Sequence, residues 1–214
     1  SEPEHAPEAF EASQLDLTGS DAATLLELTP GAEPETMGYD QVTDLRHAAI
    51  TGPWEAAWRM PEAGDLTLRL LALDEPGGEV FVGSAPAHRL APSKRVDVGK
   101  RMTWLCRRRT GAGTATAFAS VIEAQAPGSP AAVSARRLSC VAPPEAAATA
   151  LEVTHATGRD LFVIAREPAE IRVPEADLAM IGRIGVVAFN AAGAVTDAML
   201  LDGSALTVGE FALE

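Results

Sequence analysis

The histidines and carboxylates of this chain are the first residues to consider for acid–base or metal chemistry. Asp40, Asp44 and His47 lie close together in the sequence. On a strand, where side chains alternate between the two faces, Asp40 and Asp44 share one face and His47 lies on the other. The other three of the four histidines are far apart in the sequence. Because a metal site needs several such ligands to converge, we expect a polar strand face, no metal and no cofactor.

The two cysteines are the next candidates for nucleophilic chemistry. Cys106 precedes Arg107–Arg109, and a nearby positive charge lowers the pKa of a thiol. Each cysteine lies in an apolar run, and Trp104 beside Cys106 favours burial. There is no Cys-x-x-Cys and no Gly-x-Ser-x-Gly motif. We therefore expect two buried free thiols and no catalytic residue.

Binding chemistry is better represented than catalysis. Trp54 and Trp58 share a strand face, where they form either a platform for sugar rings or part of the core. The segment Arg89–Arg109 contains eight basic residues and one acidic residue, a net charge of +7 in a chain whose total charge is −13. It is either a basic binding patch or a charged sheet edge that resists aggregation. The candidate substrate-binding residues are Trp54, Trp58, Arg89, Lys94, Arg95, Lys100, Arg101, Arg107 and Arg109.

The overall charge and hydropathy pattern exclude other partners. A strongly acidic chain is unsuited to non-specific nucleic-acid binding, which needs a basic surface. No stretch approaches the roughly 18 apolar residues of a membrane-spanning helix. The first residues lack a charged and then apolar leader pattern, and the localisation stays open.

These candidate residues lie on short β-type segments separated by turn residues, a pattern typical of a sandwich or barrel. The predicted strands are 39–48, 54–59, 65–72, 79–85, 102–110, 114–123, 133–140, 149–154, 160–165, 184–189, 195–201 and 205–208, with a further short strand at 15–17. Residues 116–122 are apolar at nearly every position, which favours a central strand covered on both faces.

Three local features give further expectations. Residues 175–181 are compatible with a short helix. Ala192-Gly193 and Asp202-Gly203 have the composition of hairpin turns, the second joining the last two predicted strands. In the strand at 65–72, alternating leucines predict one apolar face and one face in water.

The sequence therefore predicts an all-β fold, an antiparallel two-layer sandwich of about twelve short strands with little helix. Residues 1–37 are expected to form an acidic arm with a first short element, and residues 38–214 the sandwich domain.

Seven short segments together resemble the C-terminal β-region of heparinase II/III-like polysaccharide lyases, the group that includes heparin and alginate lyases. They are 38–46, 52–58, 66–71, 83–86, 105–111, 118–123 and 158–163. The resemblance implies a β-sandwich that follows an upstream α/α-toroid catalytic domain in an enzyme that cleaves uronate-containing chains by β-elimination.

The resemblance transfers a role but no catalytic residue. The catalytic tyrosine and histidine of that group lie upstream of the matched region, and Tyr39, the single tyrosine, matches a strand segment instead. The implied role is a non-catalytic domain that supports the toroid and contacts an anionic polysaccharide. The alternatives are a free-standing carbohydrate-binding or structural module, and a small uronate lyase in its own right.

Overall fold

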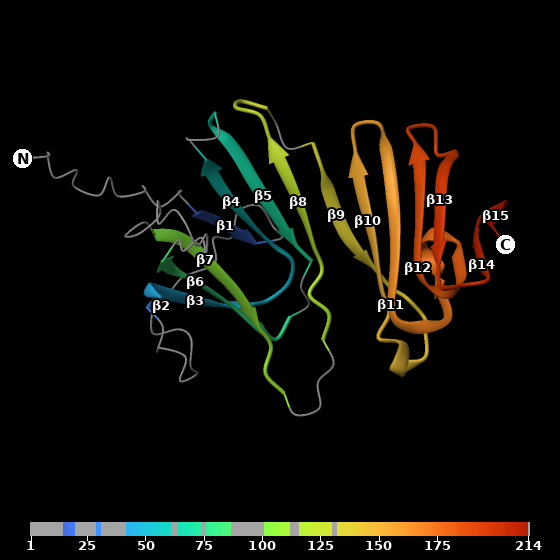
Figure 1. Ribbon diagram of the computed structural model, residues 1–214, viewed down its shortest axis with the longest axis horizontal. Coiled ribbons are helices and arrows are strands. Elements are labelled where there is room, and N and C mark those ends of the chain that lie inside the picture. The colour runs from blue at the N-terminus through green and yellow to red at the C-terminus, as the bar shows by residue number, and fades with distance from the viewer. Residues whose placement is uncertain are drawn as a thin grey trace, which may run out of the picture. The chain divides into compact units, whose positions relative to one another are not determined.

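The structure is a computed structural model that describes residues 15–19, 29–30, 42–60, 64–73, 76–86, 101–111, 116–129 and 132–213. Its regular structure is almost entirely strand, arranged in three antiparallel sheets (Figure 1). The prediction of an all-β antiparallel fold is confirmed. The acidic arm and Tyr39 lie outside the described residues.

Fifteen strands and two short 3-10 helices make up the described elements. They are β1 (Leu15–Gly19), β2 (Thr29–Pro30), β3 (Thr43–Ile50), β4 (Trp54–Met60), β5 (Leu66–Ala72), β6 (Gly78–Pro86), β7 (Arg101–Arg108), β8 (Ser120–Gln125), β9 (Ser134–Leu138), η2 (Pro144–Ala146), β10 (Thr149–His155), β11 (Gly158–Val173), η3 (Pro174–Ala176), β12 (Leu178–Asn190), β13 (Val195–Leu201), β14 (Ala205–Val208) and β15 (Phe211–Leu213). No helix among the described residues is long and apolar enough to cross a membrane.

The chain divides into two compact units, of which the first comprises Ser1–Ala112 and Ile122–Ser129. It holds two four-stranded sheets, in the orders β1-β4-β5-β8 and β2-β3-β6-β7. Alternate residues of both sheets, among them Ile50 and Val82 from one and Ala56 from the other, are buried in a common core. Face-to-face burial of this kind makes the unit a two-layer sandwich.

The position of β8 differs from the sequence prediction. Residues 116–122 were expected in a central strand, yet β8 begins at Ser120 and is the last strand in its sheet order. Ile122 is 65% exposed. An apolar composition signals burial on both faces only when other layers cover the strand, and β8 lacks such a cover over Ile122.

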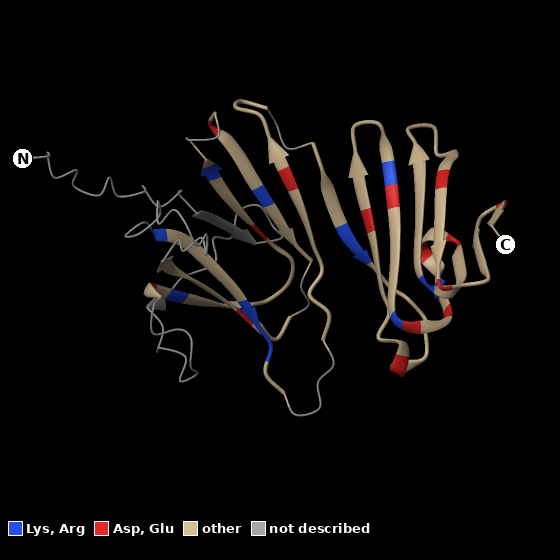
Figure 2. Cartoon of the chain, in the orientation of Figure 1, with Lys and Arg blue, Asp and Glu red and all other residues tan. Residues whose placement is uncertain are grey.

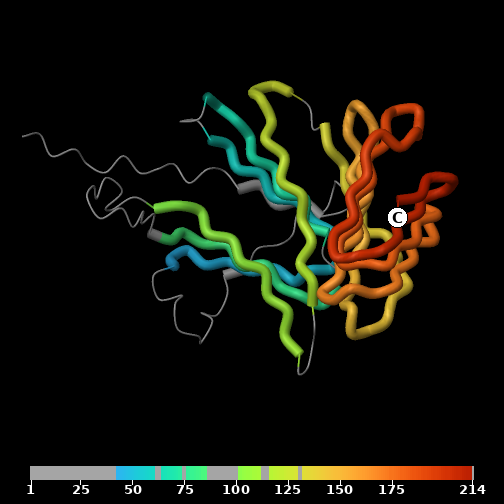
Figure 3. Tube along the Cα trace, turned by 45° about the vertical axis from the view of Figure 1, so that its right-hand side comes forward, coloured from blue at the N-terminus to red at the C-terminus, as the bar shows by residue number. Residues whose placement is uncertain are grey.

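The second unit comprises Gly113–Val121 and Pro130–Glu214. Its sheet has the order β15-β14-β12-β11-β10-β9, and β13 also pairs with β12 (Figures 1 and 3). The pairing register of the long strands β11 and β12 shifts between Ile164 and Ala169. Extra residues on one strand bend a sheet. Side chains from both sides of the shift, such as Val187 and Met180, consequently share one core.

Two local predictions in this unit are wrong. The expected helix at 175–181 is a single turn, η3, followed directly by β12. Asp202-Gly203 does not join two paired strands, because Leu201 pairs with Ile184 and Ala205 pairs with Ile181. Strands β13 and β14 therefore lie along the same edge of β12, one after the other. The Ala192-Gly193 prediction is confirmed, since this turn connects the paired strands β12 and β13.

Candidate functional site

Three of the basic residues predicted to bind a ligand, Arg101, Arg107 and Arg109, lie on β7 or directly after it, at the end of the β2-β3-β6-β7 sheet. The strand pairs with β6, with Leu105 opposite Val82 and Arg108 opposite Glu79. Leu105 packs against the core of the first unit. Because side chains alternate along a strand, Arg101 and Arg107 share the face of Leu105, while Arg108 lies on the other face.

Basic residues lie at both ends of β7 (Figure 2), and the arginines at the two ends have different partners. The guanidinium of Arg101 donates to the hydroxyls of Ser84 (2.9 Å) and Thr43 (3.0 Å), which ties three strands of the sheet together. Arg109, just after the strand, donates to the Pro76 carbonyl at 3.0 Å. Arg101 and Arg107 are six positions apart on the strand, a span of roughly 20 Å. Arg101 therefore lies apart from the basic residues at the other end.

We name Arg107, Arg108 and Arg109 the arginine end of β7. Arg107 and Arg109 are half-buried and Arg108 is exposed. The four other predicted basic residues, Arg89, Lys94, Arg95 and Lys100, lie outside the described residues. The structure thus brings Arg107 and Arg109 together at the end of one strand and leaves Arg101 at the opposite end.

Arg108 was not among the predicted site residues, but it belongs to an ordered group on the outer face of the sheet. Its guanidinium donates to Glu79 at 2.7 and 3.1 Å and lies 4.6 Å from the ring centroid of Phe81. The His47 ring stacks on the same phenyl group, with centroids 5.6 Å apart. The alternation of side chains along a strand was the sequence signal that places Arg108 on the opposite sheet face from its two neighbours.

The structure places Trp54 in the core and not on an open platform. Its side chain is 2% exposed, and it pairs across the sheet with Ala72. Trp58 lies on the same face, as the spacing predicted, and packs against the same core while remaining half-buried. A sugar ring needs an open aromatic face to stack on, so Trp54 is a packing residue in this conformation.

The polar face of β5 carries an ion-pair group instead of lying in water. Arg69 donates to Glu55 at 2.6 and 2.9 Å and to Glu123 at 3.1 Å, which links β4, β5 and β8. The Arg69 side chain is only 15% exposed. Burial by itself lowers the pKa of Arg69, but the hydrogen bonds to the two carboxylates outweigh it and raise that pKa.

Both cysteines are free thiols, as predicted, and both are half-buried. Among the described residues, no three histidine, cysteine or carboxylate side chains lie close enough to hold a metal ion. One hydroxyl–imidazole–carboxylate series occurs in the β10–β11 hairpin: Thr157 Oγ1 lies 2.9 Å from His155 Nδ1, and His155 Nε2 lies 3.4 Å from Asp160. Neither hollow described below is lined by these residues.

Positively and negatively charged side chains alternate in a row across the sheet of the second unit, and we name this row the ionic row. Glu175 accepts from Arg136 at 3.0 Å, Arg136 donates to Glu152 at 2.7 Å, and Glu152 accepts from Arg159 at 2.6 Å. The row runs over β9, β10 and β11 and ends with the Arg159 guanidinium 4.5 Å above the Phe189 ring. Sequence reasoning missed it because its members lie on separate strands.

Glu152 is the most buried carboxylate of the row, with a side chain 11% exposed. Burial alone raises the pKa of a carboxyl, but hydrogen bonds from Arg136 and Arg159 outweigh this and lower the pKa of Glu152. The pKa of Glu175 is also lowered, chiefly because the Ser139 backbone N–H donates to it. The folded second unit therefore favours the charged form of both groups.

The lowered pKa of Glu152 predicts a loss of stability in acid. A carboxyl with a depressed folded-state pKa contributes stability above its unfolded pKa, about 4.3, and loses it as the pH falls through the folded value. We expect the protection of β10 and β11 amides against hydrogen exchange, corrected for the pH dependence of intrinsic exchange, to fall between about pH 5 and pH 3 more in the native protein than in Glu152→Gln. An equal loss of protection in both proteins would contradict this role. Glu167→Gln, which removes an exposed carboxylate, is the charge-matched control.

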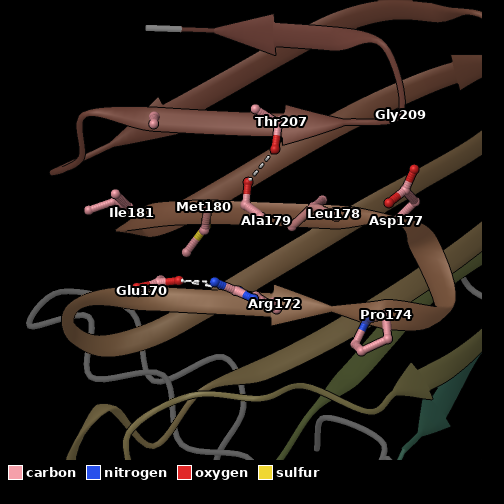
Figure 4. A pocket seen from close by; sticks show the side chains of 11 residues that line it. Glu170, Arg172, Pro174, Asp177, Leu178, Ala179, Met180, Ile181, Thr207 and Gly209 are labelled. Atoms are coloured by element: carbon pink, nitrogen blue, oxygen red, sulfur yellow. Dashed lines mark hydrogen bonds and ion pairs between the residues drawn. The ribbon is translucent and has the colours of Figure 1, made fainter.

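Two hollows in the second unit are candidate ligand sites. The first, of about 480 Å³, lies over β11, β12 and β14 and is lined by outward-facing Ala179, Ile181 and Thr207 (Figure 4). Its polar groups bond each other, with Arg172 donating to Glu170 at 2.7 Å and Thr207 donating to the Ala179 carbonyl at 3.4 Å. The second, of about 470 Å³, is lined by Arg159 and Phe189 at the end of the ionic row.

Comparisons with known proteins give no relative for this chain: no protein-family model, no curated protein and no solved structure matches it.

Proposed function

We propose that this chain is a non-catalytic β-sandwich domain of a polysaccharide lyase of the heparinase II/III-like type. In this proposal it supports an α/α-toroid catalytic domain and contacts the anionic polysaccharide on which that domain acts. The segments that carry the family resemblance include the strand signatures of β3, β4 and β5.

The observation that carries the polysaccharide contact is the arginine end of β7. The stretch 101–111 contains four arginines and no acidic residue. Three of those arginines are consecutive at the terminus of a strand that ends its sheet. Guanidinium groups bind carboxylate and sulfate groups in a forked geometry. A strand end offers such groups at a sheet corner, where an extended polyanion can reach them.

Binding of heparin and alginate to the full chain tests this proposal. We expect affinity that falls steeply with ionic strength, because screening weakens contacts between exposed charges. The double variant Arg107→Gln/Arg109→Gln should weaken heparin binding about tenfold, a loss of about 1.4 kcal/mol. It leaves the Arg108–Glu79 ion pair in place. Isothermal titration calorimetry at two salt concentrations measures both effects.

The double variant Arg166→Gln/Arg172→Gln is the matched control. It removes the same positive charge as the β7 double variant, and both residues are exposed and lie in the second unit. Equal weakening by the two double variants would reduce the contact to net charge and overturn the role of β7. Absence of heparin and alginate binding, together with tight binding of a recombinant toroid domain from the parent gene, would leave only the supporting role. An ultraviolet-absorbing unsaturated uronate produced by this chain alone would instead establish the lyase alternative.

A further inference from the structure

The second hollow lies where the two sides of the bent sheet of the second unit face each other. Phe189 contributes from the side of the bend formed with the start of β11, and Val208 from the side formed with β14. Both are core residues, each 6% exposed. Val195 and Phe211, which are half-buried, also pack against that core and line the hollow. The hollow therefore has an apolar floor that continues the core to the surface.

One cation stands at the rim of this hollow. Arg159 stacks on Phe189, and its Nη1 donates to Glu152 at 2.6 Å. A guanidinium has five N–H donors. Among the described residues, Glu152 is the acceptor that Arg159 uses, and the Arg159 side chain is 37% exposed. The ionic row thus fixes the orientation of Arg159 while leaving donors at the edge of the hollow.

Acceptors stand at the same rim. Asp177 and Glu210 are exposed and line the hollow. The backbone N–H of Gly209 donates to the Asp177 carbonyl at 3.1 Å, which holds the turn before β12 beside the turn before β15. Together with Glu152, which pairs with Arg159, the hollow and its immediate border carry three carboxylates and one guanidinium. A negatively charged ligand would meet net repulsion here.

We propose that this hollow binds a neutral sugar ring. Such a ring has a C–H face that can pack on the half-buried side chains of Val195 and Phe211. Its hydroxyls accept hydrogen bonds from Arg159 and donate them to Asp177 and Glu210. A hollow of about 470 Å³ lies within the size range of small-molecule sites. The apolar floor, the fixed donor and the two acceptors together fit a polyhydroxylated ligand, and the excess of carboxylates disfavours an anionic one.

This site does not depend on the function proposed for β7. It lies in the second unit, and it selects against the anionic chains that the arginine end of β7 would attract. The two proposals can therefore fail separately, because each is tested with variants of different residues and with ligands of different charge.

Titration of the isotope-labelled full chain with methyl glycosides, followed by NMR, tests the site. The probes are the methyl glycosides of glucose, galactose, mannose and xylose, with methyl glucuronide as the charged comparator. We expect at least one neutral glycoside to shift the amide signals of Gly193, Ala194 and Gly209 with a millimolar dissociation constant. The glucuronide should bind at least about fivefold more weakly, because it adds a like charge to the rim.

Two variants of one turn give a matched pair. Ala194 and Ala192 are both exposed residues of the β12–β13 turn, but only Ala194 lines the hollow. Ala194→Trp should abolish the shifts by filling the hollow, and Ala192→Trp should leave them unchanged. Glu210→Gln, at an exposed position, should weaken binding several-fold without unfolding the unit. Hydrogen exchange of β11 and β12 amides verifies the fold of each variant.

Three results would overturn the proposal. They are the absence of shifts at Gly193 and Gly209 with every neutral glycoside, equal affinity for the glucuronide, and binding that survives Ala194→Trp in a folded protein.

Discussion

Replacement of Gly158 by alanine is expected to unfold the second unit. A Cβ atom at this position would overlap the carbonyl oxygen of Phe189 and lie 2.9 Å from its carbonyl carbon. The backbone has little room to move away, because Gly158 pairs with Asn190 on β12 and with His155 on β10. Overlap with backbone atoms on a doubly paired strand is among the most damaging changes, and we expect a loss of at least about 4 kcal/mol.

Gly193→Ala is the matched control for this variant. Gly193 lies in the neighbouring β12–β13 turn with φ at +82°, and an added Cβ would meet no atom within 4 Å. Its replacement should cost about 1 kcal/mol from backbone strain alone. A result in which both variants are equally stable would show that the close approach at Gly158 relaxes freely.

The distribution of tryptophan makes this experiment selective. All three tryptophans, Trp54, Trp58 and Trp104, lie in the first unit. Tryptophan fluorescence therefore follows unfolding of the first unit, while hydrogen exchange of β11 and β12 amides follows the second. Gly158→Ala should abolish protection in β11 and β12 and leave the fluorescence transition of the first unit in place.

Trp54→Ala is expected to have the largest effect on the first unit. Trp54 is the largest fully buried side chain in the described part of the chain. Removing a buried tryptophan side chain loses its transfer free energy and leaves a cavity, which together cost about 3 to 5 kcal/mol. Urea unfolding, followed by the fluorescence of the two remaining tryptophans, should show a midpoint shifted to lower urea concentration.

Trp58→Ala provides the comparison, because Trp58 shares the strand face of Trp54 but is half-buried. It should cost clearly less stability than Trp54→Ala. The opposite pattern, in which Trp54→Ala keeps its stability and loses glycan binding, would restore the interpretation of Trp54 as a sugar platform.

The ionic contacts that hold the sheets involve different residues from the groups proposed to bind a ligand. Arg69 and Glu152 are largely buried and bridge three strands each. Their substitution should act mainly on stability, because an unpaired buried charge is strongly unfavourable. Arg107, Arg109 and Glu210 lie at the end of a strand or in a turn. Their substitution should act mainly on binding.

The amino-acid sequence by itself determined the class of fold and most strand positions. Alternation of apolar and polar residues, as in Leu66–Ala72, and turn residues such as Ala192-Gly193 are local signals that each segment carries within itself. It also determined that Trp54 and Trp58 share a face, because strand periodicity is a property of the backbone.

Only the tertiary structure decided which faces are covered and which strands are neighbours. The alternation of residues along a strand shows which side chains share a face, but not which face another layer covers. The sequence therefore left open whether Trp54 lies in the core or on the surface. Strand order depends on which segments pair, whether consecutive strands such as β9 and β10, where Arg136 pairs with Glu152, or distant strands such as β3 and β6. The edge position of β8, the common edge of β13 and β14 and the ionic row all follow from such pairing, which no local pattern encodes.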